Sequence, residues 1–434
     1  MISKDIAGRF KKILIRSLFF TGFMTLPLFI FSQTGDSARL DISLIKADID
    51  TLITTLLNVH PTFASHYRQN NLELKIDSIK NSLTEPMLPL DFYRMMQPVI
   101  AIDGHTTLIY TGEVYPKIKN PFFPFKVVIH NNNLYIKENL SENQELTKGT
   151  GIEKINGIPA QHIIQNLLRY MHGEMVNYKT KSLENSFHIY YRLVYGSFSN
   201  FEVTVNNIDY DLKGTDWSGF KEPSKPNFEL RFYDDDIAYL YKRSFKPPKD
   251  FIHFMDSAFK LISEKQIHHL IIDNRRGGGL GDMADSLLAC FSSYPYNLYE
   301  KKSTKISHLT NNYIELNKSS GLIKNGNFVQ EFNPHQPFRV NHFKGNTYIM
   351  VGALSYSLGT CFPASAKCYK NAIIVGEETG QPLLSNGDIN SFRLENTQIL
   401  CYTSMSIYSM PCHNNDTLHG VMPDYIVTPG LNEL

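Results

Sequence analysis

Apolar residues recur at helical spacing near the start of the chain. Between residues 40 and 58, apolar side chains lie three or four positions apart with charged residues between them: Ile42, Ile45, Ile49, Leu52, Ile53 and Leu56. This pattern predicts an amphipathic helix that ends near His60. A second helix is predicted from about Asp91, a residue type favoured at helix N-caps, toward Ile102. We therefore expect residues 34–115 to form a helical N-terminal segment.

The pattern changes to short β-type runs between about residues 120 and 225. β-Branched and aromatic residues predict strands at 125–129, 133–136 and 201–205. An Asn156-Gly157 pair predicts a tight turn, and a helix is expected from about Ala160 to Arg169. A strand, a tight turn and a helix in this order are typical of a PDZ-like peptide-binding module, and a generic β-rich insert fits the same pattern. We assign residues 116–225 to this module.

The rest of the chain, residues 226–434, alternates between apolar runs and helical patterns. Strands are predicted at 237–241, 270–273, 347–351 and 372–375, and helices at 250–263 and 282–291. Strands that alternate with helices imply a sheet covered by helices, so we expect an α/β domain here.

The first 33 residues have the pattern of a targeting segment. A basic start is followed by a mostly apolar run from Leu18 to Phe31 and then by a polar stretch. The run is short for a membrane span of roughly 20 residues, and Pro27 interrupts it. We expect a cleaved signal peptide over residues 1–33 and a periplasmic or secreted protein, with a retained membrane anchor as the alternative.

Charge argues against nucleic acid as a partner. The whole chain has a formal charge of +1. The targeting segment carries five basic residues and one acid, so the chain without it would have a charge of −3. A nearly neutral protein lacks the basic surface that nucleic acids or anionic membranes attract. Peptides, unfolded proteins or small molecules are the expected partners, and the oligomeric state is left open.

Five cysteines are present, so a complete disulfide framework is excluded by their odd number. None has a CxxC spacing. Buried free thiols are the preferred interpretation, and Cys401–Cys412 is the most plausible bridge if one exists.

Two strand-to-helix turns carry candidate chemistry. The first, Asp273-Asn-Arg-Arg-Gly-Gly-Gly279, ends a buried strand in three glycines, where free N–H groups can face a developing negative charge. A plain flexible turn would have the same composition. The second turn places Ser357 between a strand and a helix, where a serine hydroxyl is exposed as a nucleophile. A serine in this position can also simply cap the helix.

Six short motifs occur in one order along the chain: Asp103-Gly-His-Thr106, the run 151–157, Asp273 to Gly279, Ser355-Tyr-Ser357, Val375 to Gly380, and Gly420-Val-Met-Pro-Asp424. This series resembles serine peptidase family 41, which contains C-terminal-processing peptidases, the tricorn core and retinoid-binding-protein modules. The match covers about residues 40–430. The resemblance implies a catalytic domain with a ClpP/crotonase-like ββα spiral beside a PDZ-like module.

The resemblance also implies roles for single residues. Ser357 corresponds to the nucleophile, and the N–H groups of Leu358 and of Gly278, or of Gly279, to the oxyanion hole. One branch of the family has a lysine after the Gly-Glu-x-Thr-x-Gly segment, where this chain has Gln381-Pro382. A Ser/Lys dyad is therefore not expected.

The tricorn-like branch takes its base from an N-terminal histidine, which corresponds to His105. A neutral imidazole can accept the serine proton at physiological pH. This branch also has a C-terminal acid, for which Asp416 is the candidate. Asp103 could orient His105, although only Gly104 separates them. Pro363 departs from the pattern and is expected to kink the nucleophile helix.

The sequence offers no metal motif, because HExxH and paired cysteines are absent and neighbours in a strand such as His268-His269 point to opposite faces. No cofactor is expected. The predicted function is peptide hydrolysis by an exported serine endopeptidase or C-terminal processing peptidase, through an acyl-enzyme. A non-catalytic ligand- or peptide-binding protein on the same scaffold is the main alternative, and an esterase with the same Ser/His pair is another.

Overall fold

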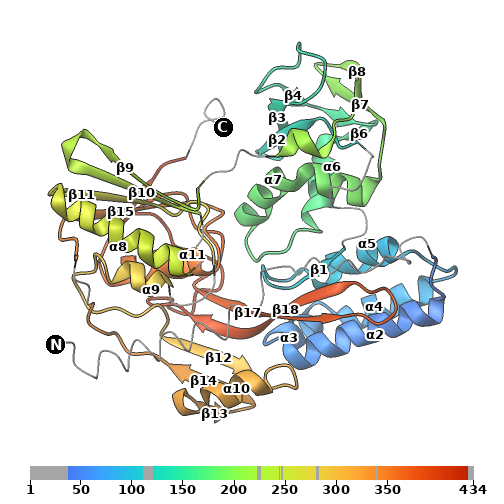
Figure 1. Cartoon of the computed structure of the whole chain (residues 1–434). Coiled ribbons are helices and arrows are strands. Elements are labelled where there is room, and N and C mark those ends of the chain that lie inside the picture. The colour runs from blue at the N-terminus through green and yellow to red at the C-terminus, as the bar shows by residue number, and fades with distance from the viewer. Residues whose placement is uncertain are drawn as a thin grey trace.

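The computed structural model of the chain describes residues 38–110, 121–221, 226–243, 245, 248–279, 283–337 and 341–428. Figure 1 shows three parts: N-terminal helices in blue, a β-rich module in green, and an α/β part around a mostly parallel sheet. The mixed α/β architecture agrees with the predicted fold class. The expected targeting segment, residues 1–33, lies outside the described residues.

Among its described residues, the N-terminal part contains the helices α2 (Ile42–Val59), α3 (Phe63–Gln69), α4 (Leu72–Ser82) and α5 (Pro89–Ile100). Helix α2 confirms the first prediction and has its C-cap at His60. Helix α5 corrects the second, because it starts two residues before Asp91. The Asp91 carboxylate instead accepts the backbone N–H of Leu88 from within the first turn. Among the described residues, no helix is long and apolar enough to cross a membrane.

The β-rich module has two small sheets and two helices. One sheet contains β2 (Phe125–His130), β3 (Asn133–Asn139) and β4 (Gly151–Ile152), and the other has the order β6 (Ile158–Pro159), β5 (Lys154–Ile155), β7 (Asn200–Val205) and β8 (Ile208–Lys213). The helices are α6 (Ala160–Leu168) and α7 (Val176–Tyr195). The three predicted strands and the helix that follows the Asn156-Gly157 turn are confirmed, and both turn residues have positive φ.

Helix α7 is absent from the sequence-based prediction for the module. A kink at Ser186, which has a φ of −126°, divides its 20 residues into two shorter helical stretches. The helical repeat of apolar positions is therefore interrupted. Its buried residues pack on both sides of the kink against the strands of the module, among them Leu183, Phe187 and Tyr191.

The main sheet has the strand order β19-β16-β15-β11-β10-β9. Its strands are β9 (Phe228–Tyr233), β10 (Ile237–Lys242), β11 (His269–Asp273), β15 (Asn346–Val351), β16 (Ile373–Gly376) and β19 (Tyr425–Ile426). All neighbours are parallel except the pair of β9 and β10. The predicted strands are confirmed, and β11 and β15 are adjacent. The glycine turn and the Ser357 turn, which follow these two strands, therefore lie side by side.

Three helices accompany the main sheet: α8 (Pro248–Glu264), α9 (Met283–Leu288) and α11 (Leu358–Cys368). Helix α8 confirms the helix predicted at 250–263. Helix α9 ends earlier than the predicted 291. Side chains of all three helices share one hydrophobic core with the sheet, as Phe251, Leu287 and Phe362 illustrate.

A second, antiparallel sheet combines a strand of the N-terminal part with strands from the C-terminal part of the chain. It contains β1 (Thr107–Ile109), β12 (Lys301–Lys305), β13 (Leu322–Lys324), β14 (Asn327–Glu331), β17 (Leu384–Arg393) and β18 (Leu400–Ser409), with helix α10 (Asn311–Asn317) beside it. Strand β18 pairs with β1, and Thr107 lies opposite Tyr402. In Figure 1 the long β17–β18 hairpin reaches from the α/β part to the N-terminal helices. The loop before β1 is thereby fixed next to the α/β part.

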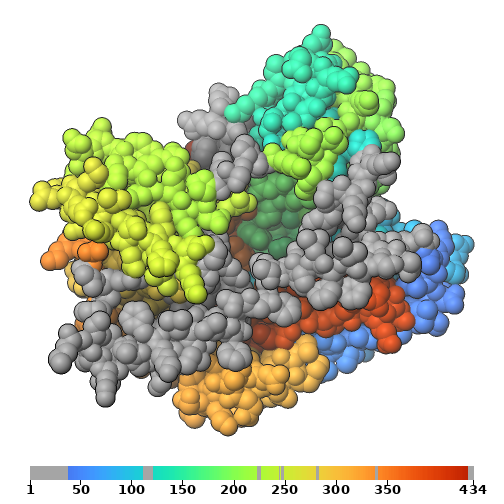
Figure 2. Space-filling view, viewed as in Figure 1, coloured from blue at the N-terminus to red at the C-terminus, as the bar shows by residue number. Residues whose placement is uncertain are grey.

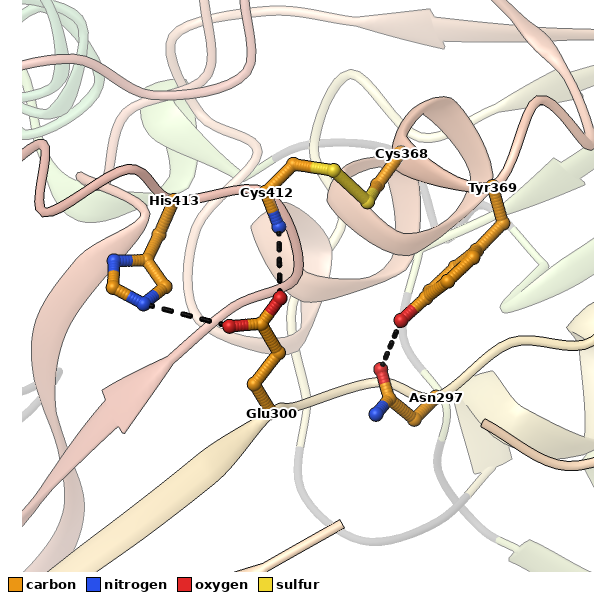
Figure 3. The surroundings of a disulfide bond; sticks show 6 residues. All are labelled: Asn297, Glu300, Cys368, Tyr369, Cys412 and His413. Carbon is orange, nitrogen blue, oxygen red and sulfur yellow. Dashed lines mark hydrogen bonds and ion pairs between the residues drawn. A yellow bond between two sulfur atoms is a disulfide. The ribbon is translucent and has the colours of Figure 1, made fainter. Parts of the chain in front are cut away.

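The predicted Cys401–Cys412 bridge is wrong, whereas buried free thiols are confirmed for three of the five cysteines. Cys368, the last residue of α11, forms a disulfide with Cys412, whereas Cys401 is free and buried, like Cys290 and Cys361. Figure 3 shows the bridge between the end of α11 and the segment after β18. Cys401 is held in β18 opposite Leu108, so it lies in the core beside the N-terminal helices.

Candidate active site

Ser357 lies at the tight turn between β15 and α11. Its backbone has φ 56° and ψ −125°, a conformation that costs a non-glycine residue energy and is seen mainly at functional sites. The Ser357 side chain makes no capping hydrogen bond to α11. Helix capping therefore does not explain this serine, and its hydroxyl is turned toward another group.

That group is His105. Its Nε2 atom lies 3.3 Å from the Ser357 hydroxyl oxygen, although the two residues are 252 positions apart in sequence. His105 sits in the loop between α5 and β1, and the pairing of β1 with β18 holds this loop in place. The structure thus brings together the two residues that the sequence proposed as base and nucleophile.

The imidazole of His105 is buried. Burial lowers its pKa, and the nearby carboxylates of Asp103 and Asp388 and the backbone of Asn386 oppose this shift only in part. Its Nδ1 atom has no hydrogen-bond partner within the described part of the chain. At neutral pH the ring is therefore uncharged and can accept a proton.

Asp103 fixes the backbone of this loop rather than the imidazole. Its Oδ1 atom accepts the backbone N–H of His105 at 2.8 Å. Its Oδ2 atom accepts Nε2–H of His60 at 2.7 Å and the hydroxyl of Ser404 at 2.9 Å. His60 has the Nε2–H tautomer because its Nδ1 accepts two backbone N–H groups. These contacts lower the pKa of Asp103 well below its usual range, even though the residue is buried.

The glycine turn lies against the Ser357 turn. The carbonyl of Gly277 accepts the backbone N–H of Tyr356 at 3.0 Å. A side chain at Gly359 would collide with that same carbonyl, so glycine is required for the close approach. Among the described residues, no acceptor is bonded to the N–H of Gly278 or of Leu358. Both N–H groups remain available to an oxygen at this place.

Pro363 does not end helix α11, which continues to Cys368. A proline has no N–H for the carbonyl four residues earlier, here that of Gly359. The side-chain amide of Asn274 donates to that carbonyl instead, at 2.6 Å. Asn274 is itself held by the ammonium group of Lys242, which is buried and 2.6 Å away.

A cavity of about 60 Å³ opens beside the pair. His105 and Ser357 lie on its wall. The other side chains that line it are partly polar and partly apolar: Gln381, Ser385, Asp388, Tyr299, Leu358, Cys361, Tyr408 and Met410. The surface is hollowed between the β-rich module and the main sheet (Figure 2).

Asp388 lies on the wall of this cavity and belongs to strand β17. The backbone of Asp388 is left-handed, with a φ of 54°, while the register of β17 against β18 is the same on both sides of it. Its carboxylate forms an ion pair of 2.6 Å with Lys302 and accepts the hydroxyls of Ser406 and Tyr408. Burial of Asp388 is offset by Lys302, which holds the pKa of this carboxyl low.

Asp416, the predicted third catalytic residue, makes its hydrogen bonds with residues of its own loop. Its carboxylate accepts the backbone N–H groups of Leu418 and His419 and pairs with the His419 ring at 3.0 Å. These bonds shape its own loop, and no described contact joins Asp416 to His105 or Ser357. They also lower the pKa of Asp416.

Several site residues were beyond sequence reasoning. His60 and Asn274 reach the site through contacts with partners far along the chain, and Asp388 lies there with a left-handed backbone inside a strand, which sequence does not reveal. The available signals were the His60-Pro61 helix end and the charged residue in an Asn386-Gly-Asp388 stretch that looks like a turn. Among the described residues, no group of three or more His, Cys, Asp or Glu side chains could hold a metal ion.

Comparison with known proteins gives a family match over part of the chain and a similarity of fold. Residues 236–427 match the family model described as Peptidase family S41. A search of curated proteins gave no match. The fold is similar to the crystal structure of mature CPAF, with a TM-score of 0.64 and 13% identity over 90% of this chain and 94% of that one. Mature CPAF complexed with lactacystin gives 0.65 and 12%, covering 90% and 95%.

Proposed function

We propose that this chain, of which residues 236–427 match the family model described as Peptidase family S41, is an exported serine peptidase with Ser357 as nucleophile and His105 as base. The observation that carries the proposal is the 3.3 Å contact between His105 Nε2 and the Ser357 hydroxyl, at a strained turn that opens a helix. Nucleophile and base within hydrogen-bond reach are the signature of an activated serine.

The chemistry follows from the positions of the groups. His105 Nε2 removes the proton of the Ser357 hydroxyl as Oγ attacks the carbonyl carbon of a peptide bond. The resulting oxyanion accepts hydrogen bonds from the backbone N–H groups of Leu358 and Gly278. Each such donor typically lowers the activation barrier by about 3 kcal/mol. The protonated His105 then gives its proton to the leaving amine, and water, deprotonated by the same ring, hydrolyses the acyl-enzyme.

Asp416 takes no part in this scheme, and Asp388 and Asn386 support the imidazole instead. Their effect on the pKa of His105 favours the positive charge that the ring acquires during acyl transfer. The backbone N–H of Ser357 is occupied by Gln381 Oε1 at 2.6 Å, so it contributes to holding the turn rather than to the oxyanion.

The cavity beside Ser357 indicates the size and polarity of the substrate side chain that fits there. Its volume of about 60 Å³ is enough for a few water molecules or one small aliphatic side chain. Leu358, Cys361 and Met410 form its apolar side. We place there the side chain that precedes the scissile bond. This cavity is far smaller than the pockets of about 300 Å³ or more that hold drug-sized ligands, so a ligand of that size does not fit beside Ser357.

The finer assignments are also proposals. We interpret the α/β part as a ββα spiral of the ClpP/crotonase kind and the β-rich module as PDZ-like, a module type that binds extended peptides by strand addition. The Cys368–Cys412 disulfide supports export, since disulfides persist mainly in oxidising compartments. The expected locations are the periplasm or the exterior.

The test is intact-mass detection of a fluorophosphonate adduct. Wild-type protein should gain one adduct, while Ser357→Ala and His105→Ala should gain none. Ser263→Ala and His253→Ala, at exposed positions of α8, are matched controls that should label like the wild type. A folded wild type that does not label would refute the proposal and favour a binding protein. Labelling together with cleavage of esters but of no peptide would favour an esterase.

A further inference from the structure

The hydroxyl of Tyr356 makes two hydrogen bonds next to the catalytic pair. It accepts the backbone N–H of Gly104 at 3.0 Å and donates to Glu174 Oε2 at 2.6 Å. Tyr356 directly precedes Ser357, and Gly104 directly precedes His105. One phenol group therefore joins the segment of the nucleophile to the segment of the base.

The surroundings of this hydroxyl leave it little freedom. Tyr356 is 93% buried, since only 7% of its surface is exposed. A Cβ atom at Gly104 would lie 2.1 Å from the Tyr356 hydroxyl, so the contact exists only because residue 104 has no side chain. The rings of Tyr356 and His105 are also close, with centroids 5.3 Å apart. A shift of Tyr356 would displace both catalytic residues.

Glu174 comes from a different part of the chain, the β-rich module. It lies in the connection between α6 and α7, two residues before α7 begins. Tyr178, in the first turn of α7, packs its ring on that of Tyr356 with centroids 4.3 Å apart. Asn177 donates to the carbonyl of Glu378 at 3.2 Å. The start of α7 is thus bound to the catalytic part by three separate contacts.

The Glu174 carboxyl is held in an unusual environment. Its Oε1 atom is buried and has no hydrogen-bond partner among the described residues. Burial, with a contribution from Asp103, raises the pKa of Glu174 to about 8. A carboxyl that stays mostly neutral can remain buried beside the anionic Asp103 while its Oε2 atom accepts the Tyr356 hydroxyl. A buried acceptor atom without a partner lowers the stability of the folded protein.

We propose that Tyr356 and Glu174 form a clasp that holds the His105 loop against the Ser357 turn, so that the β-rich module supplies a positioning residue of the active site. Neither residue touches the reacting atoms. The importance of Tyr356 and Glu174 for hydrolysis rests on the proposed function. Their effect on the position of the His105 loop is independent of that function. Displacement of a catalytic group by about 1 Å lowers a rate about 100-fold, so the clasp is expected to matter for turnover.

Three variants separate the parts of the clasp. Tyr356→Phe removes the shared hydroxyl, Glu174→Leu removes its acceptor, and Glu174→Gln keeps an acceptor oxygen without a carboxyl proton. Tyr195→Phe and Glu184→Gln, both on α7 and away from the site, are matched controls. We expect the rate of fluorophosphonate labelling to fall about 10- to 100-fold in Tyr356→Phe and Glu174→Leu. Glu174→Gln should recover most of the rate lost in Glu174→Leu.

Hydrogen exchange of the peptide 101–107 gives a readout that needs no activity. The Gly104 N–H should exchange faster in Tyr356→Phe and in Glu174→Leu than in wild type and controls, at unchanged melting temperature. Unchanged exchange in both would overturn the clasp, as would faster exchange with an undiminished labelling rate. If wild-type protein does not label at all, the proposed function fails, and exchange alone decides whether the clasp exists.

Discussion

The side-chain amide of Asn274 donates a 2.6 Å hydrogen bond to the backbone carbonyl of Gly359, within the first turn of the nucleophile helix. Pro363 cannot supply the backbone N–H that this carbonyl would otherwise accept. A residue of the glycine turn therefore completes the helix that begins after Ser357. The two turns that would form the oxyanion hole are tied to each other by this bond.

Asn274→Ala should destabilise the protein and slow acylation. Loss of a partner for a buried carbonyl costs about 1–3 kcal/mol in the free energy of unfolding, which denaturant titration measures. In a Pro363→Ala background a backbone N–H becomes available to Gly359, so the cost of Asn274→Ala should shrink. The exposed Asn311→Ala is the control and should change stability by less than about 0.5 kcal/mol. Equal costs in both backgrounds would show that Asn274 does not substitute for the missing bond.

The pH dependence of acylation should report a buried, neutral histidine. Burial lowers the pKa of His105 below the ordinary value for histidine, so its basic form predominates at neutral pH and is lost only as the pH falls through the lowered pKa. The labelling rate should therefore rise with pH to a plateau with a midpoint below pH 6.5, as rates measured at constant ionic strength from pH 4 to 8 would show. A midpoint above 6.5 would contradict the direction of the shift.

Asp388→Asn should shift the midpoint of the pH–rate profile of labelling to still lower pH, because the Asp388 carboxylate raises the pKa of His105. The substitution keeps the shape of the side chain and the acceptor oxygen for Tyr408. His105 should then be protonated less readily, and the midpoint of the labelling profile should fall. An unchanged midpoint would mean that Asp388 matters only for Lys302.

Lys302→Met should lower the stability of the protein far more than Lys301→Met, the same change at the neighbouring position. Lys302 is buried and pairs with Asp388, and removal of one partner of such a pair typically costs about 3–5 kcal/mol of stability. Lys301 is an exposed residue of the same strand, so Lys301→Met should have an effect of less than about 0.5 kcal/mol. Lys302→Met/Asp388→Asn should recover part of the loss. Melting curves of the four proteins decide the matter.

Peptide mapping without reduction should recover Cys368 and Cys412 in one linked pair. The other three cysteines should be alkylated only after unfolding, because all three are buried. Reduction should lower stability by about 2–4 kcal/mol, since the bridge closes a loop of 44 residues. Five alkylated cysteines in the unreduced, unfolded protein would show that the bridge is absent.

Sequence reasoning succeeded where the signal is local. The apolar runs of β10, β11 and β15 are short and continuous, as expected for buried parallel strands, and the Ser357 turn follows directly from one of them. His105 and Ser357 were paired by family resemblance alone, because nothing in the spacing of two residues 252 positions apart predicts a 3.3 Å contact.

The failures have a physical cause as well. Strand β17 contains Asn386-Gly-Asp388, a combination that normally marks a turn, and Asp388 has a left-handed backbone conformation within the strand. Helix α7 is interrupted by its kink. The Cys368–Cys412 bridge depends on where β18 ends relative to α11, which is a tertiary relationship. Local patterns carry no information about such distances.

The pairing of β1 with β18 has a consequence for biosynthesis. Thr107 and Tyr402 are neighbours in the folded protein, yet almost 300 residues must be synthesised between them. Contacts of such high sequence separation form late and slowly. A ribosome-bound chain that has folded its N-terminal helices still has an unsupported His105 loop. The proposed catalytic pair can therefore assemble only after nearly the whole polypeptide has been synthesised.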